Sequence, residues 1–131
     1  MGAMETSTAP RKLYIVDDSP AICERLQAIF AEDDTVRVVG QAGNAPQAVV
    51  DILALEPDSV VLDLELQGSN GLQVLRAVHP QMPDINFVVL TNHAEPQFRH
   101  ACINAGASHF LDKANEFHRV RDAVAGRPPR H

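Results

Sequence analysis

Carboxylates, a hydroxyl group and an ammonium group follow the short apolar runs of this sequence. Asp17 and Asp18 come directly after the first run, and Asp63 comes directly after the third. Thr91 follows the fourth run, and Lys113 lies just beyond the fifth. Three carboxylates that meet in one place repel one another unless a cation lies between them. Mg²⁺ (or Mn²⁺) prefers oxygen ligands, so these residue types predict a divalent metal site.

The other two side chains suit a phosphoryl ligand. A lysine ammonium and a threonine hydroxyl offer the positive charge and the hydrogen-bond donors that phosphoryl oxygens need. A carboxylate beside a bound divalent ion can itself attack phosphorus and form an aspartyl phosphate. The residues therefore predict phosphoryl chemistry, provided that the fold brings the five side chains to one place.

The apolar runs that precede these polar residues predict five β-strands. Most are rich in β-branched residues and nearly unbroken, which is typical of strands covered on both faces in a parallel sheet. The second run contains Arg37 and is expected at an edge of the sheet. The runs are residues 13–16, 36–39, 60–62, 85–90 and 108–111.

Helical patterns alternate with the strands. This alternation predicts a parallel sheet with helices on both faces. In such an α/β sheet, ligands bind at the carboxyl ends of the strands, which is where the polar residues lie. The predicted helices begin at Ser19-Pro20, Asn44-Ala45-Pro46, about Leu72, Glu95-Pro96 and about Asn115, and the last four end at Pro57, His79, Ala105 and Ala125.

Composition narrows the classes of partner. The chain has 131 residues, a length that fits one domain. Its 17 acidic and 11 basic residues argue against binding to nucleic acid or an anionic membrane by bulk charge. No Trp, one Tyr and five Phe are too few for a base-stacking surface, and no apolar stretch approaches the length of a membrane span. We therefore expect no direct nucleic-acid contact and no membrane contact by this domain.

The cysteines and the two ends carry further expectations. Cys23 and Cys102 are isolated, which predicts reduced thiols in a cytoplasmic protein. Residues 1–10 are expected to be a disordered tail whose first residues come from a vector, and residues 11–126 to be the folded domain. Residues 127–131 fit either a terminal tail or the start of a linker.

Four segments, each at the end of a predicted strand, resemble the receiver domain of two-component response regulators. The resemblance extends over about residues 13–125 and implies a flavodoxin-like (βα)5 fold with strand order 2-1-3-4-5. Residues 36–44 also resemble the second strand and loop of receivers that are attached to helix-turn-helix output domains. The four segments are 14–18 (YIVDD), 60–64 (VVLDL), 89–91 (VLT) and 106–113 (GASHFLDK).

The resemblance implies a role for each acidic residue. Asp63 would accept a phosphoryl group from a histidine kinase or from a phosphotransfer histidine. Asp18 would bind Mg²⁺ directly and Asp17 mainly through water, with Asp63 and the backbone carbonyl of Glu65 as further ligands.

The resemblance also implies a conformational switch. Thr91 and Lys113 would contact phosphoryl oxygens, and on phosphorylation the Thr91 hydroxyl would move toward the phosphoryl group while the Phe110 ring turns inward. The surface around the fourth helix, fifth strand and fifth helix would change with them. Receivers often pair through such surfaces, so a homodimer is one expected form.

The sequence departs from the receiver pattern near the site. Ala114 stands where receivers carry a proline, which predicts a trans peptide after Lys113, because a cis bond before a non-proline residue costs about 3–4 kcal/mol. Gln67 also replaces a usual proline, and Asn92 replaces a usual small residue. These departures, with Glu65 and His93 at positions that tune dephosphorylation in receivers, predict an altered phosphoryl lifetime.

Two other functions stay open. A degenerate receiver would bind partners without being phosphorylated, and the departures from the receiver pattern motivate that reading. A phosphatase with an aspartate nucleophile is more remote, because that class needs a second aspartate where Glu65 stands and it leaves the pair Asp17-Asp18 without a role. The sequence also fits both a stand-alone receiver and the receiver of a longer DNA-binding regulator.

Overall fold

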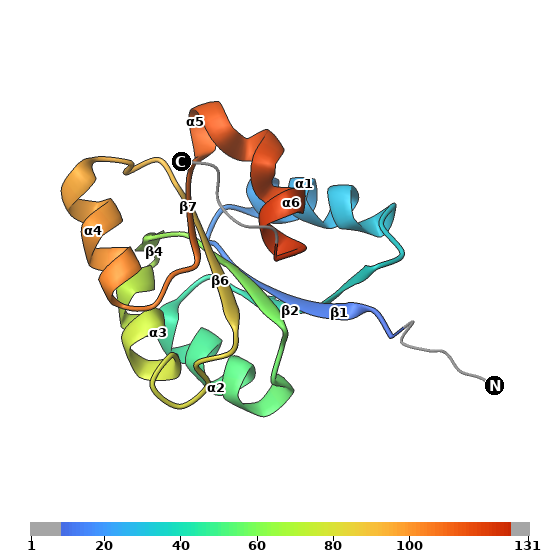
Figure 1. Ribbon diagram of the computed structural model, residues 1–131, viewed down its shortest axis with the longest axis horizontal. Coiled ribbons are helices and arrows are strands. Elements are labelled where there is room, and N and C mark those ends of the chain that lie inside the picture. The colour runs from blue at the N-terminus through green and yellow to red at the C-terminus, as the bar shows by residue number, and fades with distance from the viewer. Residues whose placement is uncertain (1–8, 127–131) are drawn as a thin grey trace.

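The computed structural model describes residues 9–126, in which five parallel strands form the central sheet (Figure 1). Their spatial order, β2-β1-β3-β6-β7, is the predicted order 2-1-3-4-5 when the strands of this sheet are counted along the chain. β2 lies at an edge, as Arg37 predicted. The strands are β1 (Arg11–Val16), β2 (Val36–Ala42), β3 (Ser59–Leu62), β6 (Asn86–Thr91) and β7 (His109–Asp112).

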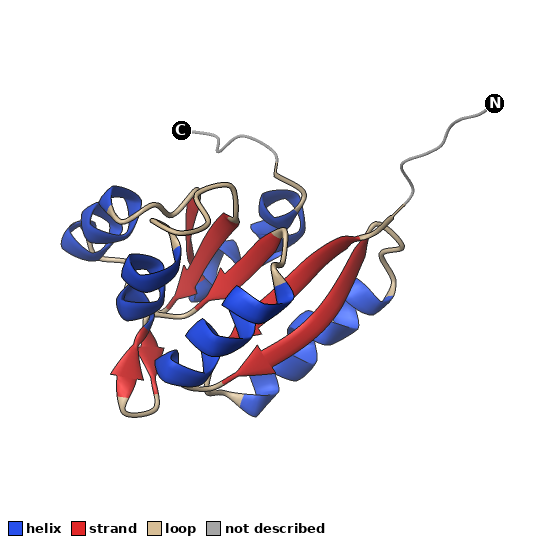
Figure 2. Cartoon of the chain, turned by 90° about the horizontal axis from the view of Figure 1, so that it is seen from below, coloured by secondary structure: helices blue, strands red, loops and turns tan. Residues whose placement is uncertain are grey.

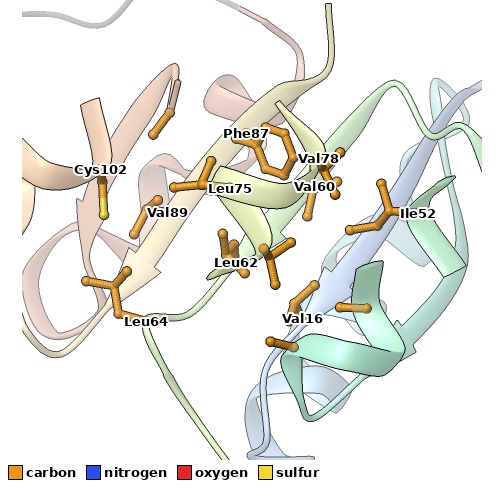
Figure 3. Packing of buried hydrophobic residues seen from close by; sticks show 14 of the residues in the cluster. Val16, Ile52, Val60, Leu62, Leu64, Leu75, Val78, Phe87, Val89 and Cys102 are labelled. Carbon is orange, nitrogen blue, oxygen red and sulfur yellow. The ribbon is translucent and has the colours of Figure 1, made fainter. Parts of the chain in front are cut away.

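Helices cover both faces of this sheet, which makes it doubly wound (Figures 1 and 2). The helices α1 (Pro20–Ala31) and α6 (Val120–Val124) pack on one face. On the other face pack α2 (Ala45–Leu55), α3 (Gly71–Val78) and α4 (Pro96–Asn104). Each face buries its own apolar cluster, and Figure 3 shows the cluster under α2, α3 and α4.

Helix starts follow from local side-chain chemistry. The Ser19 hydroxyl accepts a hydrogen bond from the Ile22 amide at 3.3 Å, and Pro20 is the first residue of α1. The Asn44 side chain accepts from the Gln47 amide at 2.9 Å in the same way at α2. These caps fix where each helix leaves the strand-end loop before it, and therefore shape the carboxyl edge of the sheet.

The last helical region differs from the prediction of one helix from Asn115 to Ala125. It is divided into α5 (Lys113–Glu116), a 3-10 turn η2 (Phe117–Arg119) and α6. α5 begins two residues early because the Asp112 carboxylate accepts from the Ala114 amide at 3.0 Å. The described residues contain no cis peptide, so the peptide between Lys113 and Ala114 is trans, as predicted.

A small hairpin was not predicted. The strands β4 (Glu65–Leu66) and β5 (Ser69–Asn70) pair antiparallel between β3 and α3. Gly68 turns the chain between them with φ of 65°, a conformation that glycine adopts without strain. The hairpin lies directly beyond Asp63 and therefore forms part of the border of the candidate site.

The structure does not describe either end of the chain. The expected tail, apart from residues 9 and 10, and the expected terminal tail or linker at 127–131 lie outside the described residues. Among the helices of residues 9–126, none is long and apolar enough to cross a membrane.

Candidate functional site

The polar residues singled out by the sequence lie at the carboxyl edge of the sheet. Asp17 follows β1, and Asp63 follows β3. The Asp63 amide donates to the Val16 carbonyl at 2.9 Å, which ties the ends of these two neighbouring strands together. Thr91 is the last residue of β6, and Lys113 follows β7. The strand order therefore brings four separate segments of the chain to one edge.

Three carboxylates meet at this edge. Asp17, Asp18 and Asp63 each offer an oxygen, and the three oxygens lie within 4.8 Å of one another. Asp17 and Asp63 are 5% and 6% exposed, whereas Asp18 is exposed to solvent. An all-oxygen donor set with one solvent-facing member fits a hard divalent cation that keeps part of its water shell.

Backbone amides hold the two buried carboxylates in place. The Ser19 amide donates to one oxygen of Asp17 at 2.9 Å, and the Glu65 amide donates to one oxygen of Asp63 at 3.3 Å. In both residues the second oxygen points to another partner, the ammonium group of Lys113. Each buried carboxylate is thus oriented from two sides.

Lys113 bridges the buried carboxylates. Its Nζ lies 2.8 Å from Asp17 Oδ2 and 2.9 Å from Asp63 Oδ2, on a side chain that is largely buried. Burial would lower the pKa of Lys113, but its hydrogen bonds to Asp17 and Asp63 outweigh that effect and the pKa is raised. The pKa of Asp17 is also raised, because burial outweighs the hydrogen bonds from Lys113 and Ser19 that act in the opposite direction. The lysine is therefore a fixed positive charge at the centre of the acidic cluster.

Thr91 is fully buried at the end of β6. Its hydroxyl oxygen accepts a hydrogen bond from the His93 amide at 3.1 Å. Accepting this bond does not use the hydroxyl proton, so the group can still donate to a phosphoryl oxygen.

Glu65 and His93 form a pair at the rim of the site. His93 Nε2 lies 3.4 Å from Glu65 Oε1, and both side chains are well exposed. The His93 ring also meets the Phe98 ring edge-on, with 5.8 Å between the ring centres. Asn92 is exposed beside them. A groove of about 330 Å³ lies between this rim and the helices α3 and α4, and Cys102 is among the residues that line it.

Phe110 lies on the helix-α4 side of β7. Its ring is 6% exposed and belongs to the same apolar cluster as Val89, its partner across β6 and β7. The inward ring position that the receiver resemblance associates with phosphorylation is thus the one that the structure contains.

One residue of the site escaped the sequence analysis. Gly71, the first residue of α3, packs so closely on Asp63 that a Cβ atom would overlap the Asp63 backbone carbonyl. Its amide donates to the Leu64 carbonyl at 2.9 Å. The pair Asn70-Gly71 is a helix-start signal, but its contact with the strand end depends on the hairpin, which the sequence pattern does not show.

Known proteins share these features. A family model described as response regulator receiver domain matches residues 13–125. The DNA-binding transcriptional activator DevR/DosR of Mycobacterium tuberculosis is 33% identical over 120 residues, which cover 88% of this chain and 55% of that protein. A protein-glutamate methylesterase/protein-glutamine glutaminase of Rhizobium etli is 36% identical over 101 residues, which cover 76% of this chain and 29% of the enzyme.

A solved structure of a response regulator has a similar fold. The two-component response regulator of the LuxR family from Aurantimonas sp. SI85-9A1 superposes with a TM-score of 0.78 at 26% identity. The superposition covers 92% of this chain and 89% of that chain. The chain spans about half the length, or less, of the two curated relatives.

Proposed function

The chain belongs to the response regulator receiver domain family, and on that premise we propose that Asp63 accepts a phosphoryl group from a histidine kinase or a phosphotransfer histidine. The observation that carries the proposal is the Lys113 ammonium held between Asp63 and Asp17, with Asp18 open to solvent beside them. This arrangement combines a carboxylate nucleophile, a fixed cation and an oxygen-rich metal site.

A metal ion would complete this site. Asp17, Asp18, Asp63 and the backbone carbonyl of Glu65 would hold Mg²⁺ or Mn²⁺, with Asp17 acting mainly through water. The bound ion supplies positive charge that offsets the carboxylates and stabilises the phosphoryl oxygens.

Each side chain of the site would have its own role in the phosphoryl transfer step. An oxygen of Asp63 attacks phosphorus, and the bond from phosphorus to the donor histidine nitrogen breaks, leaving its electron pair on the imidazole. Lys113 stabilises the negative charge of the phosphoryl oxygens, and the Thr91 hydroxyl donates to one of them. Because the Glu65 amide already orients Asp63 and Lys113 lies within hydrogen-bonding distance, little reorganisation would be needed before the attack.

Phosphorylation would then be communicated by Thr91 and Phe110. Movement of the Thr91 hydroxyl toward the phosphoryl group pulls on the loop that leads from β6 to α4, because the His93 amide is bonded to that hydroxyl. The surface that responds comprises α4, β7 and the helical region after β7. Stabilising one of two arrangements of this surface would be the output of the domain, whether to a partner protein or to a second copy.

We also propose that Glu65, Asn92 and His93 tune the phosphoryl lifetime. The pair between Glu65 and His93, 3.4 Å apart, would lie beside the path of a water molecule that hydrolyses the aspartyl phosphate. The domain would catalyse only its own phosphorylation and dephosphorylation. Its proposed location is the cytoplasm, which the free, buried thiols of Cys23 and Cys102 support.

The experiment that tests the proposal is labelling with acetyl phosphate and Mg²⁺, read by intact mass spectrometry. Wild type should gain a phosphoryl adduct, and Asp63→Asn should lose it. Asp84→Asn, an exposed aspartate away from the site, is the matched control and should label like wild type. An unlabelled wild type, or an undiminished adduct in Asp63→Asn, would refute the proposal, and the first result would favour a receiver that acts without phosphorylation.

A further inference from the structure

A contact between α4 and β7 has no part in the phosphoryl chemistry proposed above. The guanidinium carbon of Arg99 lies 5.8 Å from the centre of the Phe110 ring, over the ring. A cation at that distance from an aromatic face is attracted to its electrons. Phe110 is 6% exposed, whereas Arg99 is partly exposed, so the guanidinium covers a ring that is otherwise packed in the apolar cluster.

Phe110 lies at the edge of the sheet, where the Arg99 guanidinium is one of the groups that can hold its ring in place. β7 is one of the two edge strands of the five-stranded sheet, so no further strand of the sheet lies beyond Phe110. The helix α4, which carries Arg99, contacts β7 (Figure 1). A ring that left the inner position would part from both the apolar cluster and the guanidinium.

We propose that Arg99 is a positioning residue that holds the Phe110 ring in its inner position and so sets the resting balance of the switch. The inference rests on the proposed function insofar as the inner ring position is the one favoured by a phosphoryl group at Asp63. Arg99 would then favour the switched arrangement before any phosphoryl transfer. Because the ring position and phosphoryl binding are linked, the free energy by which Arg99 stabilises the inner ring position also raises the affinity for a phosphoryl mimic.

The expected size follows from exposed cation–π contacts. Loss of the cation should shift the ring equilibrium about two- to fivefold toward the outer position. The apparent affinity for beryllofluoride with Mg²⁺ should fall by at most the same factor, because only the inner fraction is competent to bind. Arginine and alanine are both strong helix formers, so Arg99→Ala should leave α4 intact.

The test is fluorine NMR of protein labelled with 4-fluorophenylalanine, with the Phe110 signal assigned through Phe110→Leu. In the free protein, the Phe110 signal of Arg99→Ala should move away from its wild-type position, and beryllofluoride should return it. Arg99→Lys, which keeps a cation, should restore part of the wild-type position, whereas Arg99→Gln should behave like the alanine variant. His100→Ala, an exposed neighbour on the same helix, is the control and should change nothing.

Two results would overturn the role of Arg99. One is a Phe110 signal that stays at the wild-type position in free Arg99→Ala, and the other is a wild-type signal in Arg99→Gln. Failure of beryllofluoride to bind any variant, wild type included, would instead contradict the proposed phosphoryl function. The free-protein spectra would still decide whether Arg99 holds the ring.

Discussion

Replacing Lys113 with methionine isolates the electrostatic role of the ammonium group. Methionine has a similar length but no charge, so the substitution removes both ion pairs while filling much of the same space. Coulomb attraction is about 6 kcal/mol for each pair at the observed 2.8 and 2.9 Å, with an effective dielectric constant of about 20. The desolvation of three buried charges offsets most of this attraction.

The net loss of unfolding free energy in Lys113→Met can be estimated in two ways. Removing one partner of a buried ion pair costs about 3–5 kcal/mol, because a buried charge is left unpaired. Here the two carboxylates can relieve their repulsion by taking up one proton. At pH 7 that costs about 4 kcal/mol, since the ordinary pKa of aspartate lies about 3 units lower. We therefore expect Lys113→Met to lose about 3–4 kcal/mol when divalent ions are chelated.

Urea denaturation in EDTA and in millimolar Mg²⁺ is the assay. A divalent ion bound by the carboxylates would supply the missing positive charge, so Mg²⁺ should stabilise Lys113→Met more than it stabilises wild type. The control is Lys12→Met, which changes the other lysine of the sequence and should show no Mg²⁺-dependent difference from wild type. The reasoning fails if Lys113→Met is as stable as wild type in EDTA, or if its deficit is the same with and without Mg²⁺.

Three further predictions concern other parts of the molecule. Asn86 Nδ2 donates to the Ala123 carbonyl at 2.8 Å, at the edge of the sheet opposite the site. Asn86→Leu should therefore lower the free energy of unfolding by about 1–3 kcal/mol in urea denaturation and leave the affinity for beryllofluoride unchanged. A weakened affinity would show that this contact and the site are coupled. Burial raises the pKa of the Cys102 thiol to about 11, so as pH rises above about 8.5 the unfolded thiol loses its proton while the folded one keeps it. Wild type should therefore lose about 2–3 kcal/mol of stability between pH 8.5 and 11 from this group, and Cys102→Ala should show a shallower decline in the same titration; parallel curves would exclude the effect. Gly71→Ala should displace the Asp63 carbonyl, with a stability loss of about 1–3 kcal/mol and slower labelling by acetyl phosphate; a wild-type labelling rate would show that the strand end tolerates the shift.

The parallel α/β class of the fold and the sheet edge that carries the main polar residues could be predicted from sequence because both follow from simple periodic rules, whereas the strand order was implied by the resemblance to receiver domains. Unbroken apolar runs marked the strands, and their alternation with amphipathic segments fixed a parallel sheet. The carboxyl ends of parallel strands share one edge of the sheet, so Asp17, Asp63, Thr91 and Lys113 were expected at that edge. Local capping chemistry at Ser19 likewise set the start of α1 correctly.

Features that depend on tertiary packing could not be predicted in this way. The hairpin around Gly68 is too short for a periodic signal, and the contact of Gly71 with Asp63 exists only once that hairpin has turned the chain. The last helical region is interrupted at Phe117, whose ring is buried under the Arg25 guanidinium at 3.7 Å. The prediction of one helix from Asn115 to Ala125 did not show the 3-10 turn there.

The most informative feature that the sequence did not show is the unequal exposure of the three carboxylates. Two of them are buried and shared with Lys113, and the third faces solvent. The lysine therefore offsets part of the repulsion that a metal ion would otherwise have to relieve alone, which would keep the site assembled between the proposed phosphoryl transfers. Under the proposed function, the same ammonium would turn toward the phosphoryl oxygens when Asp63 becomes an acyl phosphate, since Asp63 would then lose its carboxylate charge. Asp17 is not altered by that proposed step, and its ion pair at 2.8 Å would hold Lys113 in place as the other partner of the lysine changes.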